Sequence, residues 1–383
     1  MDFELSEELA EVQKLARDFS EKEIAPNAAK DDREHIFRRD LVSKMGELGF
    51  YGCLIPEEYG GNGLGFLAHA LISEEIGRVH SAIRVYLNMQ AGPAVTLYEF
   101  GNETQKKTHL PKLLSGATNG LFAITEPDAG SDVAAMKTTA KRDGSSYILN
   151  GTKIWITNAT VADFGVIFAY TDRAQKHRGM SAFYADLNQP GVSRRELDKL
   201  GAHASPTGEL TFENFRIPVE NLIGQEGDGF KICMRHLNHT RLGCAAGAVG
   251  LATAAREAAV SYANQREQFG QKIGQFQMNQ DLIAQMVVQE EAARLLVYRA
   301  ACLADRGRPY NLEASMAKYA AAEAAAFCAD NALKILGAYG YSTEFPVERY
   351  YRDAKSYQIV EGSVNIQKLI IGQDALGYRK ANR

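Results

Sequence analysis

The sequence predicts an α+β protein of three consecutive domains, because its residue pattern changes character twice along the chain. Residues 1–120 are dominated by apolar positions at helical spacing, whereas residues 121–226 hold short β-rich runs between Gly, Pro and Asp. Residues 227–383 return to long, alanine-rich amphipathic segments. A chain of 383 residues is too long for a single core. We therefore expect an N-terminal helical domain, a middle β domain and a C-terminal helical bundle.

The N-terminal domain is expected to be entirely helical. A first helix is predicted over 5–28, where Leu, Val and Phe recur every three or four residues until Pro26 ends it. The glycine-rich loop over 56–63 lacks GxGxxG spacing and follows no strand, so it is not a dinucleotide-binding fingerprint. Further helices are predicted over 38–48, 67–77, 80–99 and 103–114.

The middle domain is expected to form a small antiparallel barrel or sandwich. Residues 147–157 predict a strand, a tight Asn150-Gly151 turn and a second strand. No helix-length segment separates the strands of this region, which argues against parallel βαβ units. Additional strands are predicted over 164–170, 180–185 and 209–212.

The C-terminal domain is expected to be a four-helix bundle. Its segments are longer than isolated helix propensity supports, so they must bury faces on each other or on neighbouring subunits. The helices are predicted over about 227–266, 275–306, 312–337 and 363–375.

The bulk composition excludes several classes of protein. The net charge of −4 gives no excess of Lys and Arg for a nucleic-acid-binding face, and no apolar run approaches a membrane span. His236 and His239 share a helix face without an acidic cluster, so we expect no metal site. An acidic start without a signal pattern predicts a cytoplasmic protein. Five cysteines without a CxxC pair agree with that location: Cys53, Cys233, Cys244, Cys302 and Cys328.

One carboxylate stands out in the segment 357–363. Glu361 lies between an apolar run and a Gly-Ser turn, and Ser363 is placed to cap the helix that follows. A carboxylate at the edge of an apolar wall is suited to abstracting a proton. On this segment alone, ordinary helix-start chemistry is the simpler interpretation.

The loop 125–132 combines hydroxyls, acids and a flexible backbone at the junction of two domains. Thr125 and Ser131 can donate to carbonyls or phosphates, and Gly130 allows a ligand to approach the backbone. The alternative is a polar linker with ordinary turn chemistry.

Two further segments carry ligand-binding side chains. Trp155, the only tryptophan, is followed by Thr157, and this pairing suits either a planar heterocycle or a barrel core. Arg266 at the end of the longest helix can clamp a pyrophosphate, with Phe269 beside it. The alternative is an Arg that complements a helix C-terminus, with Gly270 as the C-cap.

Taken together, these segments resemble the acyl-CoA dehydrogenase family over essentially the whole chain. The resemblance implies an α–β–α subunit, a homotetramer, one FAD per subunit and electron transfer flavoprotein as the acceptor. It also implies removal of an α proton from an acyl thioester and transfer of a hydride from Cβ to the flavin. The motifs appear in the family's order and spacing: TEPDAGSD at 125–132, WITN at 155–158, RxxFG at 266–270 and YxIxEGS at 357–363.

The resemblance assigns roles to individual residues. Glu361 is the implied base, Arg241 lies near the thioester, and Ser131 contacts the CoA moiety beside the cofactor. Lys334 departs from the family pattern, since Gln often contacts FAD there, and 337–340 replaces a usual Gly-Gly pair. The residues implied to contact FAD are Thr125, Trp155 and Thr157 at the flavin, Gly362 and Ser363 on the phosphate side, and Arg266 and Phe269 across a subunit boundary.

Arg84 indicates which acyl group is bound. It resembles the Arg with which glutaryl-CoA dehydrogenases bind the distal carboxylate, although it can instead pair with Glu74 or Glu75. Gly77 and Val360 stand where the decarboxylating enzymes have Glu and Tyr. Segments 203–210, 237–242 and 360–367 resemble the non-decarboxylating glutaryl-CoA dehydrogenases, so we expect oxidation to stop at glutaconyl-CoA.

Several alternatives stay open at this point. Within the family, the substrate can be another short, branched or cyclic acyl-CoA, or an acyl group on a carrier protein. The electrons can pass to oxygen, as in an oxidase. A protein of another class, a non-catalytic helical scaffold, is compatible with the same helical pattern.

Overall fold

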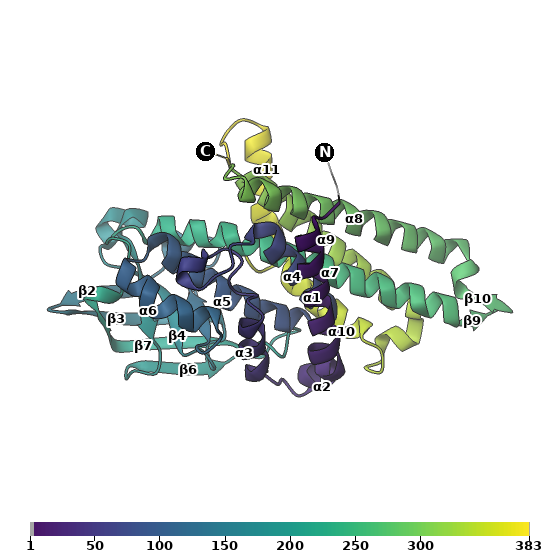
Figure 1. Ribbon diagram of the computed structural model, residues 1–383, viewed down its shortest axis with the longest axis horizontal. Coiled ribbons are helices and arrows are strands. Elements are labelled where there is room, and N and C mark those ends of the chain that lie inside the picture. Colours follow the sequence, from purple (N-terminus) through teal and green to yellow (C-terminus); the bar gives the residue numbers. More distant parts are fainter. Residues whose placement is uncertain (1–3, 383) are drawn as a thin grey trace.

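The computed structural model describes residues 4–382, and the chain up to Leu114 is helical as predicted (Figure 1). The segment predicted as one helix over 5–28 is interrupted, however. After Phe19 the backbone widens into a π-turn, Ser20–Ile24, and a 3₁₀ turn containing Pro26 leads into the next helix. The α-helices are α1 Glu7–Phe19, α2 Ala28–Arg33, α3 Arg39–Glu47, α4 Gly65–Val79, α5 Ser81–Phe100 and α6 Glu103–Leu114.

The middle region forms one eight-stranded, mostly antiparallel sheet in the order β6-β7-β3-β2-β4-β5-β8. β1 and β2 each pair in parallel with β4, so the sheet is mixed. Its apolar core lies between the faces of the curved sheet, around Leu149, Phe183 and Phe212. The strands are β1 Gly120–Ala123, β2 Thr139–Asp143, β3 Ser146–Thr157, β4 Phe164–Tyr170, β5 Met180–Asp186, β6 Val192–Glu196, β7 Thr207–Pro218 and β8 Leu222–Ile223.

The predicted turn at Asn150-Gly151 is wrong. Both residues lie within the continuous strand β3, at a shift in its register with β7. Gly151 is needed there because a Cβ atom would come within 2.4 Å of the Thr138 hydroxyl oxygen. The hairpin turn instead joins β2 to β3 at residues 143–146.

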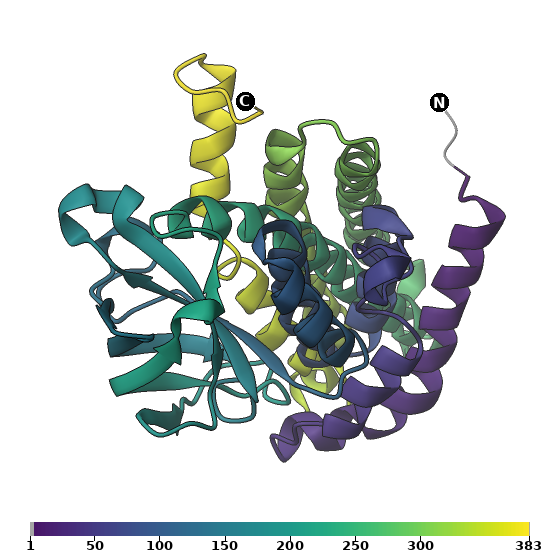
Figure 2. The ribbon, with the colours of Figure 1, turned by 60° about the vertical axis from the view of Figure 1, so that its left-hand side comes forward.

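From Gly229 onward the chain is helical again, apart from a short hairpin of β9 (Glu267–Gln268) and β10 (Gln271–Lys272). A helix that the sequence pattern did not predict, α10, packs on α7 and α9. The last helix, α11, contacts α9 but stands away from the rest of the molecule (Figure 2). The helices are α7 Gly229–Gln265, α8 Gln277–Asp305, α9 Asn311–Leu336, α10 Val347–Tyr357 and α11 Val364–Ala375.

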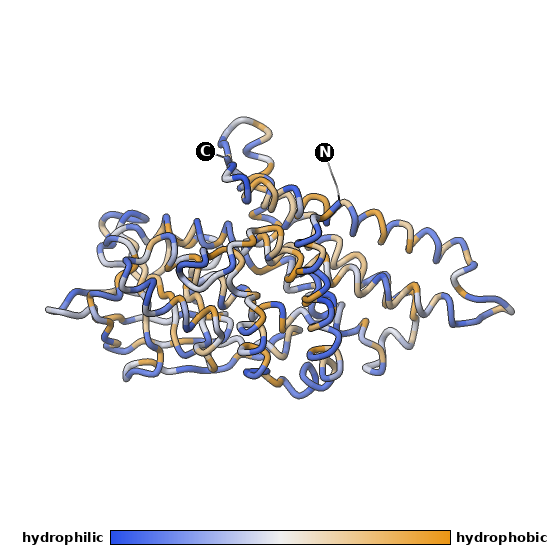
Figure 3. Tube along the Cα trace, viewed as in Figure 1, coloured by the Kyte–Doolittle hydropathy of each residue, from blue (hydrophilic) through white to orange (hydrophobic). Residues whose placement is uncertain are grey.

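The fold class is therefore confirmed: helices, a β sheet and a helical bundle follow one another along the chain. The division at residues 120 and 226 stays a prediction about folding units. α4 and α5 pack on α7, which joins the N-terminal helices to the bundle along a buried seam. Apolar residues follow the inner helices and strands, and hydrophilic residues predominate at the outer ends (Figure 3). Among the helices of residues 4–382, none combines the length and apolar character that crossing a bilayer requires.

Candidate active site

Glu361 lies on the turn between α10 and α11, in a conformation that side chains rarely adopt. Its φ is +55° and that of Gly362 is +81°. Two side chains hold this turn through the Gly362 carbonyl, which accepts hydrogen bonds of 2.9 Å from both Lys318 Nζ and Gln367 Nε2. Ser363 caps α11, as predicted, by accepting from the Ile366 N–H. The strained turn is thus fixed from both sides, as expected where backbone strain serves a function.

The Glu361 carboxylate is held by two neutral donors rather than by a salt bridge. The Thr240 hydroxyl on α7 donates to Oε2 at 2.6 Å, and the Asn88 amide on α5 donates to Oε1 at 3.3 Å. The same Asn88 nitrogen lies 3.1 Å from the Thr240 carbonyl oxygen. Both donors are buried, so the carboxylate is oriented by hydrogen bonds from inside the protein.

Arg84 is a buried cation without a carboxylate partner. Its side chain is on the seam between α5 and α7, it is 3% exposed, and Nε and Nη1 have no hydrogen-bond partner. The Tyr357 ring lies 5.4 Å from its guanidinium carbon. A Cβ at Gly247 would come within 2.7 Å of the Arg84 side chain, so glycine makes room for it on α7.

The alternative pairing of Arg84 with Glu74 or Glu75 is wrong. Glu74 bonds to Arg294 at 2.8 Å and to the Tyr298 hydroxyl at 3.1 Å. Glu75 is bound by Arg17, with the closest contact at 2.7 Å. Both acids point to other elements, so neither of them neutralises the charge of Arg84.

Arg241 is the second buried arginine of the site, one residue after Thr240 on α7. Its Nη1 has the Asn238 side-chain oxygen at 3.1 Å and Ser315 Oγ at 3.4 Å, while Nε has no partner. Burial lowers the pKa of Arg241 from its ordinary value. Two buried arginines without an ion-pair partner among residues 4–382 therefore lie near the Glu361 carboxylate.

The loop 125–132 is organised by a buried ion pair. Glu126 accepts from Lys153 Nζ at 2.7 Å and from the backbone N–H groups of Lys137 and Thr138. Burial lowers the pKa of Lys153 to about 8, against the opposing effect of Glu126. The Ile154 N–H donates to the Thr125 carbonyl at 2.9 Å, which brings the loop beside β3. Ser131 is exposed on the same loop.

Trp155 does not belong to the barrel core, so that alternative is wrong. It is 57% exposed and has a φ of +58°, whereas Ile156 next to it is buried. Thr157 and Thr125 are half-buried on the two segments that the backbone contact joins. An exposed indole beside hydroxyls fits a planar ring system.

Arg266 and Phe269 are not brought to this site within one chain. Phe269, 92% exposed, is in the turn of the β9–β10 hairpin, at the far end of the molecule from the sheet (Figure 1). Gly270 belongs to the same hairpin turn and does not cap the helix. Arg266 lies over the Tyr339 ring at 5.7 Å, and Lys334 pairs with Asp330. The predicted contact of Arg266 and Phe269 with a cofactor therefore requires a second subunit.

The two histidines considered for a metal site have other partners. His236 stacks on Phe122 with the ring centroids 3.5 Å apart, and its Nδ1 is 2.9 Å from the Thr96 hydroxyl. His239 Nε2 lies 3.1 Å from Glu99. Over residues 4–382, no three His, Cys, Asp or Glu side chains are grouped so as to hold a metal ion.

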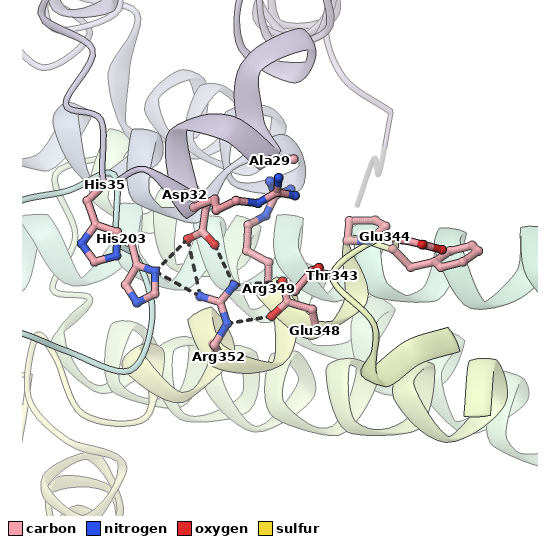
Figure 4. A pocket seen from close by; sticks show the side chains of 12 residues that line it. Ala29, Asp32, His35, His203, Thr343, Glu344, Glu348, Arg349 and Arg352 are labelled. Carbon is pink, nitrogen blue, oxygen red and sulfur yellow. Dashed lines mark hydrogen bonds and ion pairs between the residues drawn. The ribbon is translucent and has the colours of Figure 1, made fainter. Parts of the chain in front are cut away.

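A separate cavity of about 350 Å³ lies between α2, α10 and the turn that precedes α10. Figure 4 shows that Arg352, one of the cations that line it, already has carboxylate partners. Arg352 bonds to Asp32 at 2.6 Å and to Glu348 at 2.8 Å, and His203 lies 3.5 Å from Asp32. We call Asp32, His203, Glu348 and Arg352 the Arg352 cluster, and its internal pairing favours a structural role.

Three residues at the site were missed by sequence reasoning. Thr240 directly precedes Arg241, which the sequence analysis did identify, so its position next to that residue could have indicated it. Asn88 follows Arg84 by one helical turn, which places both on one face of an otherwise apolar helix. Lys318 stands in an alanine-rich helix and carries no local signal of its contact with the turn of Glu361.

Comparison with known proteins identifies relatives along the whole chain. The acyl-CoA dehydrogenase N-terminal, middle and C-terminal domain models match residues 6–117, 121–215 and 227–376. A glutaryl-CoA dehydrogenase of Desulfococcus multivorans is 55% identical, with all of both chains covered. The mitochondrial short-chain specific acyl-CoA dehydrogenase of Mus musculus is 44% identical over 98% of this chain and 92% of its own.

A solved structure extends the similarity to three dimensions. The structure of a glutaryl-coenzyme A dehydrogenase glutaryl-CoA complex superposes with a TM-score of 0.98 at 54% identity. The match covers 100% of this chain and 98% of that chain. Sequence and fold therefore agree on the same group of relatives.

Proposed function

The chain belongs to the acyl-CoA dehydrogenase family and is an oxidoreductase, and from this premise we propose that it oxidises glutaryl-CoA to glutaconyl-CoA. One observation carries the choice of acyl group. Arg84 is a buried guanidinium whose Nε and Nη1 make no hydrogen bond, and no carboxylate of residues 4–382 forms an ion pair with it. A substrate with a distal carboxylate supplies the missing partner, whereas a plain acyl chain leaves the charge buried and unpaired. The glutaryl-CoA dehydrogenase relative supports the same choice.

In the proposed reaction, Glu361 takes the α proton of the acyl group, and the electron pair of that C–H bond forms the new double bond as hydride leaves Cβ. Thr240 and Asn88 hold the carboxylate in its orientation. Arg241 lies beside the thioester. The strained turn presents the backbone N–H of Glu361 to the thioester oxygen, which stabilises the charge that develops there.

FAD, when bound, supplies the acceptor for the hydride. The residues present fit this cofactor, since an exposed Trp155 stands near Thr125 and Thr157, with the start of α11 close to the base. Thr125, Trp155 and Thr157 would hold the ring system, while Gly362 and Ser363 would face the phosphates. Arg266 and Phe269 of a second copy would complete the site, and Ser131 would bind the CoA moiety.

We propose that oxidation proceeds without decarboxylation. At Gly77 a Cβ would come within 2.6 Å of the Gly247 carbonyl oxygen, so the packing of α4 on α7 excludes the Glu of the decarboxylating enzymes. Val360, next to the base, offers no hydroxyl where those enzymes have Tyr. The site thus lacks two polar groups that would handle the departing carboxylate.

The assembly and partners follow from the same proposal. Phe269, Met278, Val288 and Leu369 are exposed apolar side chains on the hairpin, α8 and α11, as expected of surfaces covered in a homotetramer. Electron transfer flavoprotein is the proposed acceptor. All five cysteines are free, which suits a reducing compartment such as the cytoplasm.

Incubating the purified yellow protein with glutaryl-CoA and an artificial electron acceptor tests the proposal. Glutaconyl-CoA is the expected product, and crotonyl-CoA as the sole product, or no turnover, rejects it. A panel of short, branched, cyclic and carrier-bound acyl thioesters distinguishes the alternatives within the family. Peroxide formation would instead identify an oxidase, and colourless protein would identify a scaffold.

A further inference from the structure

Asn88, Thr240 and Glu361 close a ring of hydrogen bonds across three elements of the fold. The Asn88 nitrogen lies 3.1 Å from the Thr240 carbonyl oxygen and 3.3 Å from Glu361 Oε1. The Thr240 hydroxyl completes the ring through Glu361 Oε2 at 2.6 Å. An amide nitrogen carries two hydrogens, so Asn88 can serve both acceptors at once. The ring joins α5, α7 and the turn before α11.

Resting on the proposed function, we propose that Asn88 is a positioning residue for the dehydrogenation, because its amide nitrogen holds the second oxygen of Glu361. With the hydrogen bond from Thr240 alone, the carboxylate could still rotate about that one contact. The Thr240 carbonyl anchors the Asn88 nitrogen, so the second hydrogen is directed at Oε1. With both oxygens bound, the carboxylate has one orientation toward the substrate.

The other charged and titratable groups near Glu361 stay constant in the comparison. Arg84 faces it from α5, Arg241 from α7 and Lys318 from α9, and each interacts electrostatically with its carboxylate. The thiols of Cys233 and Cys244 also face it, and burial raises the pKa of both. These groups are the same in wild type and variant, so a change at residue 88 isolates the amide.

A purely structural role for Asn88 predicts different behaviour from a positioning role. As a simple bridge between α5 and α7 through the Thr240 carbonyl, its replacement would lower Tm and leave the kcat and the proton exchange of the folded protein nearly unchanged. As a positioning residue, it must donate, and Asn88→Asp places a second acceptor beside Glu361 and the Thr240 carbonyl. Asn88→Ala removes the amide without adding charge.

The experiment uses flavin-loaded protein with glutaryl-CoA and an artificial acceptor over a series of pH values. For Asn88→Ala we expect about a tenfold decrease in kcat with KM nearly unchanged, because a hydrogen bond to a charged group is lost. Asn88→Asp is expected to show a larger decrease in kcat. Exchange of the substrate α proton into D₂O, without acceptor, should slow in parallel.

The matched control is Gln105→Ala, which removes a buried amide that bonds to the Glu220 and Leu222 carbonyls far from the base. It is expected to lower Tm and to leave the pH profile and proton exchange unchanged. If Asn88→Ala does not fold, Asn88→Asp and Asn88→Ser decide, since Asp preserves size and Ser is too short to reach Glu361 from α5.

Two negative outcomes are distinguishable. If Asn88→Asp turns over glutaryl-CoA as fast as wild type, with an unchanged pH profile and an unchanged rate of proton exchange, the role of Asn88 is overturned and the proposed function stands. Wild-type protein that turns over no acyl-CoA rejects the proposed function, and the role of Asn88 with it.

Discussion

Two arginine-containing regions of this molecule differ in how their charges are completed. In the Arg352 cluster, the guanidinium has two carboxylates within 3 Å, from Asp32 and Glu348 (Figure 4). At the Glu361 turn, Arg84 is more deeply buried and its free nitrogens have no partner at all. The first region ties α10 to α2, whereas the second lies where α5 meets α7.

The difference teaches that incomplete pairing, more than the number of charges, identifies a ligand site. A buried guanidinium without a partner destabilises the fold unless something else compensates it. The chain has acids near Arg84 in sequence, yet Glu74 and Glu75 bond to Arg294 and Arg17 instead. The cavity beside the Arg352 cluster has the volume of a ligand site, but these charges are already satisfied.

The largest expected effect is at the base itself. Glu361→Gln keeps the shape of the side chain but cannot accept the α proton, so we expect kcat to fall by about a thousandfold or more. Visible flavin absorbance should be retained, because the substitution is nearly isosteric. Glu344→Gln, at an exposed position beside the other cavity, is the matched control with unchanged kcat. A Glu361→Gln protein with full activity would remove the proton-abstraction role.

Arg84→Met tests the unpaired cation. We expect kcat/KM for glutaryl-CoA to fall about 30- to 1,000-fold, because the distal carboxylate loses its partner in a buried site. This decrease corresponds to a loss of about 2–4 kcal/mol of transition-state stabilisation. Butyryl-CoA, which has no such carboxylate, should be oxidised as well as before or better. Steady-state kinetics with both thioesters measures the change in preference. Equal losses for the two substrates would mean that Arg84 supports the fold and does not select the substrate.

Arg352→Met is the corresponding change in the paired region and should have the opposite signature. It leaves Asp32 buried without its guanidinium, so we expect the free energy of unfolding to fall by about 3 kcal/mol. The ratio of kcat/KM values for glutaryl-CoA and butyryl-CoA should stay unchanged. Denaturant unfolding and the same kinetic assay check both points. A shift in substrate preference would contradict the division between the two regions.

Local patterns predicted much of the fold, and the failures have physical causes. Ser363 was identified as a helix cap because the signal lies within three residues. Asn150-Gly151 misled, since glycine there accommodates Thr138 from a neighbouring segment and forms no turn. α10 was missed because its buried face includes Arg349 and Asp353, which hide the apolar period.

The candidate site was predictable only where its residues form motifs. The motif around Glu361 was recognisable from order and spacing. The lack of an ion-pair partner for Arg84 was not recognisable, because it depends on which residue Glu74 binds. That residue is Arg294, which lies 220 residues from Glu74 along the chain. Asn88 escaped for the same reason, since its partner Glu361 is 273 residues distant.

The smallest expected effect concerns Asp353, which adjoins the Arg352 cluster on α10. Burial raises the pKa of Asp353 from 3.8 to about 6, although its Oδ1 accepts from the Ala202 N–H at 2.6 Å. Between these two values the folded chain binds more protons than the unfolded chain, so this group lowers stability as pH rises from about 4 to about 6. Asp353→Asn can keep the bond to Ala202 and removes the ionisation. The variant should therefore gain about 2 kcal/mol on wild type across that pH window. Denaturant unfolding at about pH 4 and about pH 7 measures the difference, and a gap that does not change with pH would show that Asp353 is compensated as fully as Asp32.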